Sequence, residues 1–131
     1  MGGVTLDSST LVAILNPGDV HHDLVVSHLT GRADRFSIST ITLVETLVYA
    51  YQQGSRQGVR YKALIDSAVK EIFPVDEEVA LEASKLRART GLKTPDAIIS
   101  ATATLAQTQL WTLDQRLAKA HKGAILIGGE K

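Results

Sequence analysis

The chain has 131 residues, a length typical of one domain, so we expect residues 1–131 to form a single unit. Fourteen basic and fourteen acidic residues cancel, which excludes a global positive field as the means of binding nucleic acid. The absence of cysteine excludes disulfides and thiolate metal sites and fits a cytoplasmic protein, and no apolar run reaches the roughly 18 residues of a membrane span.

The amino-terminal third alternates apolar strands with helices. Residues 4–6 are an expected strand that ends at Asp7, which is a good N-cap for the apolar helix that follows. A second helix is expected from Asp19, with Gly31 at its end. Residues 36–38 form the next expected strand.

The middle of the chain continues this alternation. From Thr40 to Tyr51 the apolar residues recur at helical spacing. A polar, glycine-bounded break at residues 54–58 precedes another helix. Residues 72–75 are the third expected strand, and their proline indicates a strand end or an edge of the sheet.

The last third follows the same order. Asp76 opens a helix that ends at Gly91, and Thr94 is the expected cap of the next helix, with proline directly after it. Further strands are expected at residues 109–112 and 124–127. Strands separated throughout by helices predict an α/β fold with three layers, α/β/α, around a central parallel sheet of about four to five strands.

Four carboxylates near helix starts are the most informative side chains: Asp7, Glu45, Asp96 and Asp114. The first three are each the only charge in a long uncharged stretch. An isolated carboxylate among apolar neighbours needs a partner, and ligands of parallel sheets gather at the carboxyl ends of the strands. We therefore expect these side chains to meet at one edge.

Each carboxylate also has a simpler explanation. Asp7 and Asp114 suit N-caps, and Asp96 suits the positive end of a helix dipole. Glu45 matches a capping box with Thr42, although the helical pattern begins upstream and places Glu45 in the second turn. Four carboxylates at one edge would repel each other unless a cation lay among them. Oxygen ligands alone suit Mg²⁺ or Mn²⁺, which act on phosphates.

Four motifs carry a resemblance to a known family: Leu6–Ser9, Ser39–Glu45, Thr94–Ile99 and Trp111–Asp114. In their order and spacing the chain resembles PIN-domain nucleases, most closely the VapC type of toxin ribonuclease from toxin-antitoxin pairs. The resemblance implies a hydrolase, an Mg²⁺- or Mn²⁺-dependent endoribonuclease that leaves a 5′-phosphate.

The resemblance also implies roles for single residues and partners. It makes Asp7 and Asp96 direct metal ligands and Asp114 a ligand directly or through water, with Glu45 completing the acidic pocket. Ser9 and Thr112 would orient metal-bound water by hydrogen bonds. The implied partners are an RNA substrate, a cognate antitoxin that covers the pocket, and a second copy of the chain. The sequence itself favours an interface in the segment 47–51, which has more apolar residues than one face of a helix can bury.

Five basic residues are candidate RNA contacts: Arg56, Arg60, Arg87, Arg89 and Lys93. The segment of Arg56 and Arg60 also suits a solvated loop, and Arg87, Arg89 and Lys93 also suit a helix end. We expect none of the four histidines in the metal site: His21, His22 and His28 suit a partly exposed helix, and His121 a helix C-terminal cation. Two alternatives remain open, a non-catalytic PIN-like binding module and a metal-dependent phosphatase.

Overall fold

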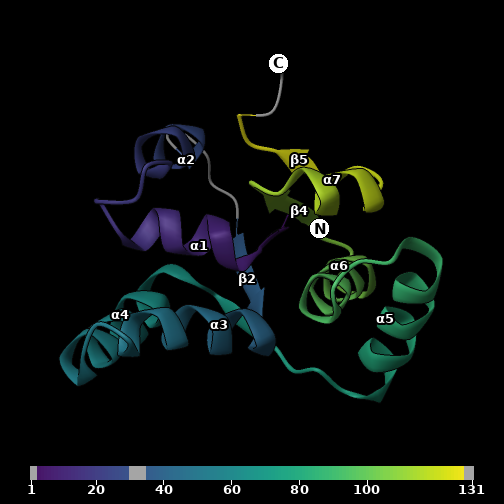
Figure 1. Ribbon diagram of the computed structural model, residues 1–131, viewed down its shortest axis with the longest axis horizontal. Coiled ribbons are helices and arrows are strands. Elements are labelled where there is room, and N and C mark those ends of the chain that lie inside the picture. The colour runs from purple at the N-terminus through teal and green to yellow at the C-terminus, as the bar shows by residue number, and fades with distance from the viewer. Residues whose placement is uncertain (1–2, 30–34, 129–131) are drawn as a thin grey trace.

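The computed structural model describes residues 3–29 and 35–128, in which five strands and seven helices alternate (Figure 1). The strands are β1 (Gly3–Leu6), β2 (Arg35–Ser39), β3 (Glu71–Phe73), β4 (Gln109–Thr112) and β5 (Ile125–Leu126). The helices are α1 (Ser8–Leu15), α2 (His22–Leu29), α3 (Thr40–Tyr51), α4 (Ser55–Ala68), α5 (Glu77–Thr90), α6 (Thr94–Ala106) and α7 (Gln115–Ala120).

The strands form one parallel sheet in the order β3-β2-β1-β4-β5. The central strand β1 pairs with β2 on one side, where Thr5 lies beside Ser37, and with β4 on the other, where Thr5 lies beside Leu110. The chain therefore changes direction across the sheet between β1 and β4. In open parallel sheets such a switch point creates a crevice at the carboxyl ends of the strands.

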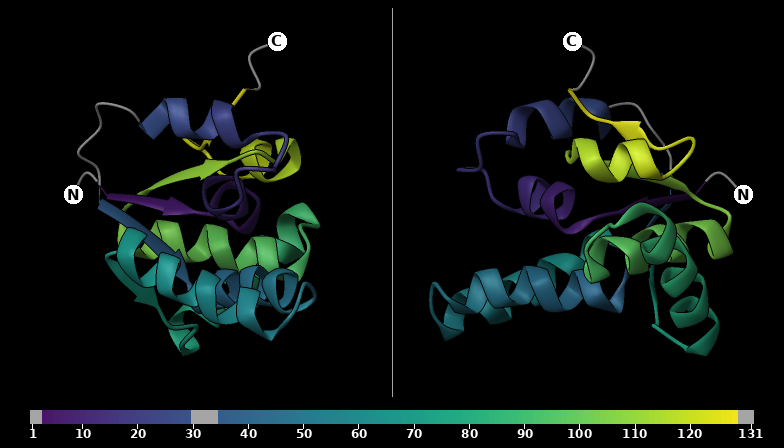
Figure 2. Two further views of the ribbon diagram at one scale, coloured as in Figure 1. Left: turned by 90° about the vertical axis from the view of Figure 1, so that its left-hand side faces the viewer. Right: turned by 45° about the vertical axis from the view of Figure 1, so that its right-hand side comes forward.

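The two faces of the sheet carry separate apolar clusters. Neighbouring side chains of a strand point to opposite faces, and β4 accordingly sends Trp111 into the cluster with Leu11 and Val25, and Leu110 into the cluster with Leu117. Figure 2 shows α2 and α6 on opposite sides of the strands. The predicted three-layer α/β/α arrangement is confirmed, and none of the described helices has the length and hydropathy of a membrane span.

Some element boundaries differ from the predicted ones. Helix α2 begins at His22, three residues after Asp19, because the Asp19 Oδ1 atom accepts the backbone N–H of His21 in a local turn. The predicted end of this helix at Gly31 lies outside the described residues. Strand β3 stops at Phe73, directly before the proline, at the edge of the sheet.

The predicted cap of α6 is wrong by one residue. Lys93 is the N-cap, and Thr94 is already helical. The Thr94 hydroxyl instead accepts a hydrogen bond of 3.1 Å from Arg87 Nε, which ties the end of α5 to the start of α6. The other predicted cap residues hold, since Asp76 Oδ1 accepts the Val79 N–H and Gly91 ends α5 in a left-handed conformation.

Helices α3 and α4 form a hairpin whose close packing depends on one glycine. Gly58 is buried in α4, and the ring of Tyr51 from the end of α3 lies where a Cβ atom of residue 58 would be. Two residues of the predicted apolar surplus, Leu47 and Tyr49, pack against the core, whereas Val48 and Tyr51 remain about half exposed. The hairpin thus presents a partly apolar outer surface.

We expect Gly58→Ala to lower the free energy of unfolding by about 1–3 kcal/mol, because the new methyl group would overlap the Tyr51 ring. In a Tyr51→Ala background the same change should raise stability by up to about 1 kcal/mol, since alanine is the better helix former. Thermal denaturation of the four proteins measures this reversal of sign. A stabilising effect in both backgrounds would contradict the packing.

Candidate functional site

Asp7 is a buried carboxylate held by three hydrogen bonds. It follows β1 and is the N-cap of α1, and its Oδ1 atom accepts the Thr10 N–H and the Ser9 hydroxyl, both at 3.0 Å. The Thr112 hydroxyl from the end of β4 donates to Oδ2 at 2.5 Å. Burial raises the pKa of Asp7, and the Thr112 hydrogen bond opposes that shift most strongly. Sequence and fold therefore place an acid at the switch point.

Glu45 reaches the same region from α3. The helix begins at Thr40 with Ser39 as its N-cap, so Glu45 lies in the second turn, as predicted. The Ser8 hydroxyl at the start of α1 donates to Glu45 Oε1, which shows that the capping-box alternative is wrong. Ser8 is a positioning residue that the sequence reasoning missed, because its contact joins two helices far apart in the chain.

Asp96 and Asp114 complete the acidic group. Asp96 lies in the first turn of α6, and its pKa is raised to about 6, first by burial and then by repulsion from the carboxylates of Asp114, Asp7 and Glu45. Lys93 opposes this shift. Asp114 is the N-cap of α7, and its Oδ1 atom accepts the backbone N–H groups of residues 116 and 117. Burial and the neighbouring carboxylates thus both disfavour the charged form of Asp96.

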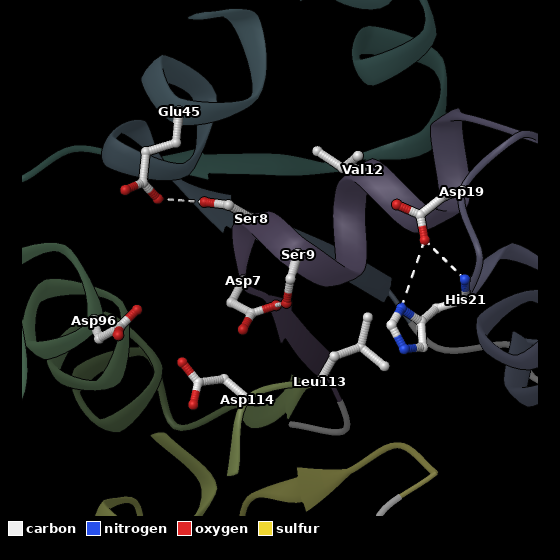
Figure 3. Close-up of a pocket in the computed structure, with 10 residues that line it drawn as sticks. All are labelled: Asp7, Ser8, Ser9, Val12, Asp19, His21, Glu45, Asp96, Leu113 and Asp114. Atoms are coloured by element: carbon white, nitrogen blue, oxygen red, sulfur yellow. Dashed lines mark hydrogen bonds and ion pairs between the residues drawn. The ribbon is translucent and has the colours of Figure 1, made fainter. Parts of the chain in front are cut away.

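One cavity of about 510 Å³ gathers these side chains at the carboxyl ends of β1 and β4 (Figure 3). Its lining consists of Asp7, Ser8, Ser9, Val12, Asp19, His21, Glu45, Asp96, Leu113 and Asp114. The four predicted carboxylates therefore meet in space, as the sheet topology requires. Asp7, Asp96 and Asp114 come from the starts of three helices, and Glu45 comes from the second turn of α3.

The carboxylates face the cavity without converging on one point. Among the described residues, no group of three or more histidine, cysteine, aspartate or glutamate side chains has the arrangement of a finished metal site. The donor set is nevertheless one that suits hard cations, because it offers oxygen atoms, uncompensated negative charge and no sulfur. Side-chain rotation about χ1 and χ2 would be needed to bring oxygens from three carboxylates to a common ion.

The other predicted site residues fall into two groups. Ser9 and Thr112 both lie at Asp7, where their hydroxyls bond its carboxylate directly, and their predicted role toward water stays a prediction. The basic candidates all lie outside the cavity lining. Lys93 comes closest through its effect on Asp96, whereas Arg89 lines a separate cavity beside His121.

Arg56 and Arg60 are exposed near the start of α4, which follows the far end of α3. Twelve residues of α3 span roughly 18 Å, so the start of α4 is about two turns beyond Glu45. Neither arginine lines the cavity, although Arg60 is next to Tyr61, whose pKa is raised by burial and influenced both by Arg60 and by the cavity residue Asp19. The exposed side chain of Arg60 also meets Gln57 at 3.4 Å.

Two histidines differ from their predicted roles. His21 precedes α2 and lines the acidic cavity, although it is not part of the four-carboxylate group. The sequence pattern missed this because it began the helix at Asp19. His121 does end α7, but burial lowers its pKa and its Nδ1 atom lies 2.6 Å from the Ser100 hydroxyl, so the prediction of a helix-end cation is wrong.

A family model described as the PIN domain matches residues 4–123. The chain belongs to the PIN-domain family. The match spans β1 to the end of α7 and so includes all four carboxylates of the cavity. No curated protein matches the chain in a direct search.

Solved structures give the PIN domain clear neighbours. A chain of a toxin-antitoxin complex from Klebsiella pneumoniae is 27% identical, with a TM-score of 0.79 over 94% of this chain and 96% of that one. VapC20 from Mycobacterium tuberculosis, a sarcin-ricin loop cleaving toxin, is 20% identical, with a TM-score of 0.78 over 90% and 95%. A chain of VapBC2 from Rickettsia felis is 17% identical, with a TM-score of 0.73 over 94% and 96%. The last two share the fold.

The raised pKa of Asp96 predicts a pH-dependent stability in this PIN domain. The pKa of Asp96 is near its ordinary value of 3.8 in the unfolded chain and about 6 in the fold, so its contribution to stability is complete below pH 4 and lost as the pH rises through 6. In Asp96→Asn the side chain cannot ionise, so the variant does not lose this stability as the pH rises. With EDTA present, we expect the variant to melt higher than the wild type at pH 7.

The difference between the two melting temperatures should shrink as the pH falls from 7 to 4. Thermal melts across this range measure it, and Asp23→Asn, an exposed aspartate of α2 outside the cavity, is the matched control. A variant that melts lower than the wild type at pH 7 would contradict repulsion at Asp96.

Proposed function

We propose that this PIN domain is a metal-dependent endoribonuclease and the toxin of a toxin-antitoxin pair. The observation that carries the proposal is the cavity at the β1–β4 switch point, into which Asp7, Glu45, Asp96 and Asp114 project. The names of the structural neighbours support it, because toxins of this fold include one that cleaves the sarcin-ricin loop.

Asp7, Asp96 and Asp114 would hold an Mg²⁺ or Mn²⁺ ion. Asp114 keeps one carboxylate oxygen for this, since the hydrogen bonds of its capping role go to Oδ1. When bound, the ion would lower the pKa of a water molecule and stabilise charge on the phosphate. An ion among these acids would also relieve the repulsion that raises the pKa of Asp96.

The protein's own contribution is to restrain two of the acids, Asp7 and Glu45, before substrate arrives. Thr112 and Ser9 hold both oxygens of Asp7, so this buried side chain cannot turn away from the cavity. Ser8 fixes Glu45 across the α1–α3 contact. Such restraint of functional groups by neighbouring hydrogen bonds preserves the geometry that catalysis needs.

Two protein partners belong to the proposal. The neighbours from Klebsiella pneumoniae and Rickettsia felis are described as toxin-antitoxin and VapBC structures, which supports a cognate antitoxin for this chain. A second copy of the chain would suit α3, where Val44, Val48 and Tyr51 are 50–55% exposed along one side.

We expect Asp7→Asn and Asp96→Asn each to reduce Mg²⁺- or Mn²⁺-dependent RNA cleavage at least about a hundredfold. Losing a residue that only hydrogen-bonds a metal ligand typically costs about 10- to 100-fold, and losing the ligand itself should cost more. Asparagine keeps the capping hydrogen bonds of Asp7, so circular dichroism should show an intact fold. Cleavage of labelled RNA on denaturing gels is the measurement. Asp23→Asn should cleave like the wild type, and full activity in either site variant would contradict the proposal.

Substrate phosphates should contact cations near the start of α6. We expect Arg87→Glu with Lys93→Glu to weaken RNA binding and to reduce the slope of log K against log salt by about 0.7 per lost contact. Arg56→Glu with Arg60→Glu changes the charge equally but on α4, and should act less on a short RNA. Equal effects of the two pairs in fluorescence anisotropy would contradict this placement.

A further inference from the structure

The wall of the cavity opposite the four carboxylates carries a second polar pair, Asp19 and His21. Figure 3 shows the four acids on one side and this pair on the other. The His21 N–H donates to Asp19 Oδ1 at 2.8 Å, and the ring Nδ1 lies 3.7 Å from the same oxygen. Asp19 thereby fixes the backbone of His21 and lies beside its ring, and the other ring nitrogen, Nε2, is turned away from Asp19.

An apolar strip separates the two polar ends of the cavity. Val12 from α1 and Leu113 from the β4–α7 connection lie between the acids and the Asp19–His21 pair (Figure 3). The cavity therefore has a strongly acidic end, an apolar middle and a mixed polar end. Its volume of about 510 Å³ is within the range of pockets that take small organic ligands.

His21 is also distinctive in its charge. Five of the ten lining residues are carboxylates, and within the described part of the chain His21 is the one lining side chain that can carry a positive charge. Its side chain is 50% exposed, so a ligand can reach it, whereas the Asp19 side chain is 24% exposed and serves as support. A flat, polar ring beside an apolar surface suits a nucleobase.

We propose that Val12, Leu113 and the Asp19–His21 pair form a subsite for one unpaired nucleobase next to the scissile phosphate. The inference rests on the proposed nuclease function and adds a specificity site to it. With the phosphate at the acids, the ribose and base of the neighbouring nucleotide extend over the apolar strip. The His21 ring then stacks on the base or bonds its edge, and Asp19 acts as a positioning residue for that ring.

A protein–substrate double-mutant cycle tests this subsite. The substrate is a single-stranded oligoribonucleotide that the wild type cuts, compared with two versions lacking the base on the 5′ or the 3′ side of the cut. For the wild type, one abasic version should raise KM roughly tenfold with kcat little changed, the size expected for one bound base. With His21→Ala the intact RNA should already have the raised KM, and removing the base should add little.

Asp19→Asn should shift KM in the same direction but less, because it loosens the His21 ring without removing it. Val20→Ala and Asp23→Asn, exposed neighbours outside the lining, should keep the full penalty for the missing base. If His21→Ala also keeps that penalty, the subsite is refuted while the nuclease function stands. If the wild type cuts no RNA, both the function and the subsite are refuted.

Discussion

The buried carboxylate of Asp7 is the constraint around which this PIN domain is arranged. It lies at the end of the central strand, and its two oxygens accept hydrogen bonds from α1 on one side and from Thr112 of β4 on the other. An unpaired charge at this depth would be strongly unfavourable. The pairing of β1 with β4 and the start of α1 therefore both supply hydrogen bonds to this buried acid. These bonds replace water around a carboxylate that lines the cavity.

Helix capping and a position in the acidic cavity prove compatible for these residues. Asp7 and Asp114 are true N-caps, and Asp96 does lie at the positive end of α6. A parallel sheet begins its helices beside the carboxyl ends of its strands, so the acids that cap those helices are brought to a common edge. Burial, and then repulsion among these acids, raises the pKa of Asp96. The acids thus stabilise the helix starts while their negative charges repel one another.

The sequence predicted the features that depend on local pattern. Isolated charges in apolar stretches identified Asp7, Glu45 and Asp96, and strand-helix alternation predicted the sheet that brings them together. The sequence pattern could not predict contacts between distant segments, such as the one between Ser8 and its partner on α3. His21 was missed for a related reason, because a side-chain turn at Asp19 delays α2 and directs the ring into the cavity. Periodicity carries no signal for either contact.

The central claim is that the acids of the β1–β4 cavity bind a divalent cation. Isothermal titration of the 131-residue chain with Mn²⁺ tests this without any assumption about RNA. We expect saturable binding that is lost or greatly weakened in Asp7→Asn and Asp96→Asn and unchanged in Asp23→Asn. The absence of binding to the wild type, or equal binding by the two site variants, would contradict it.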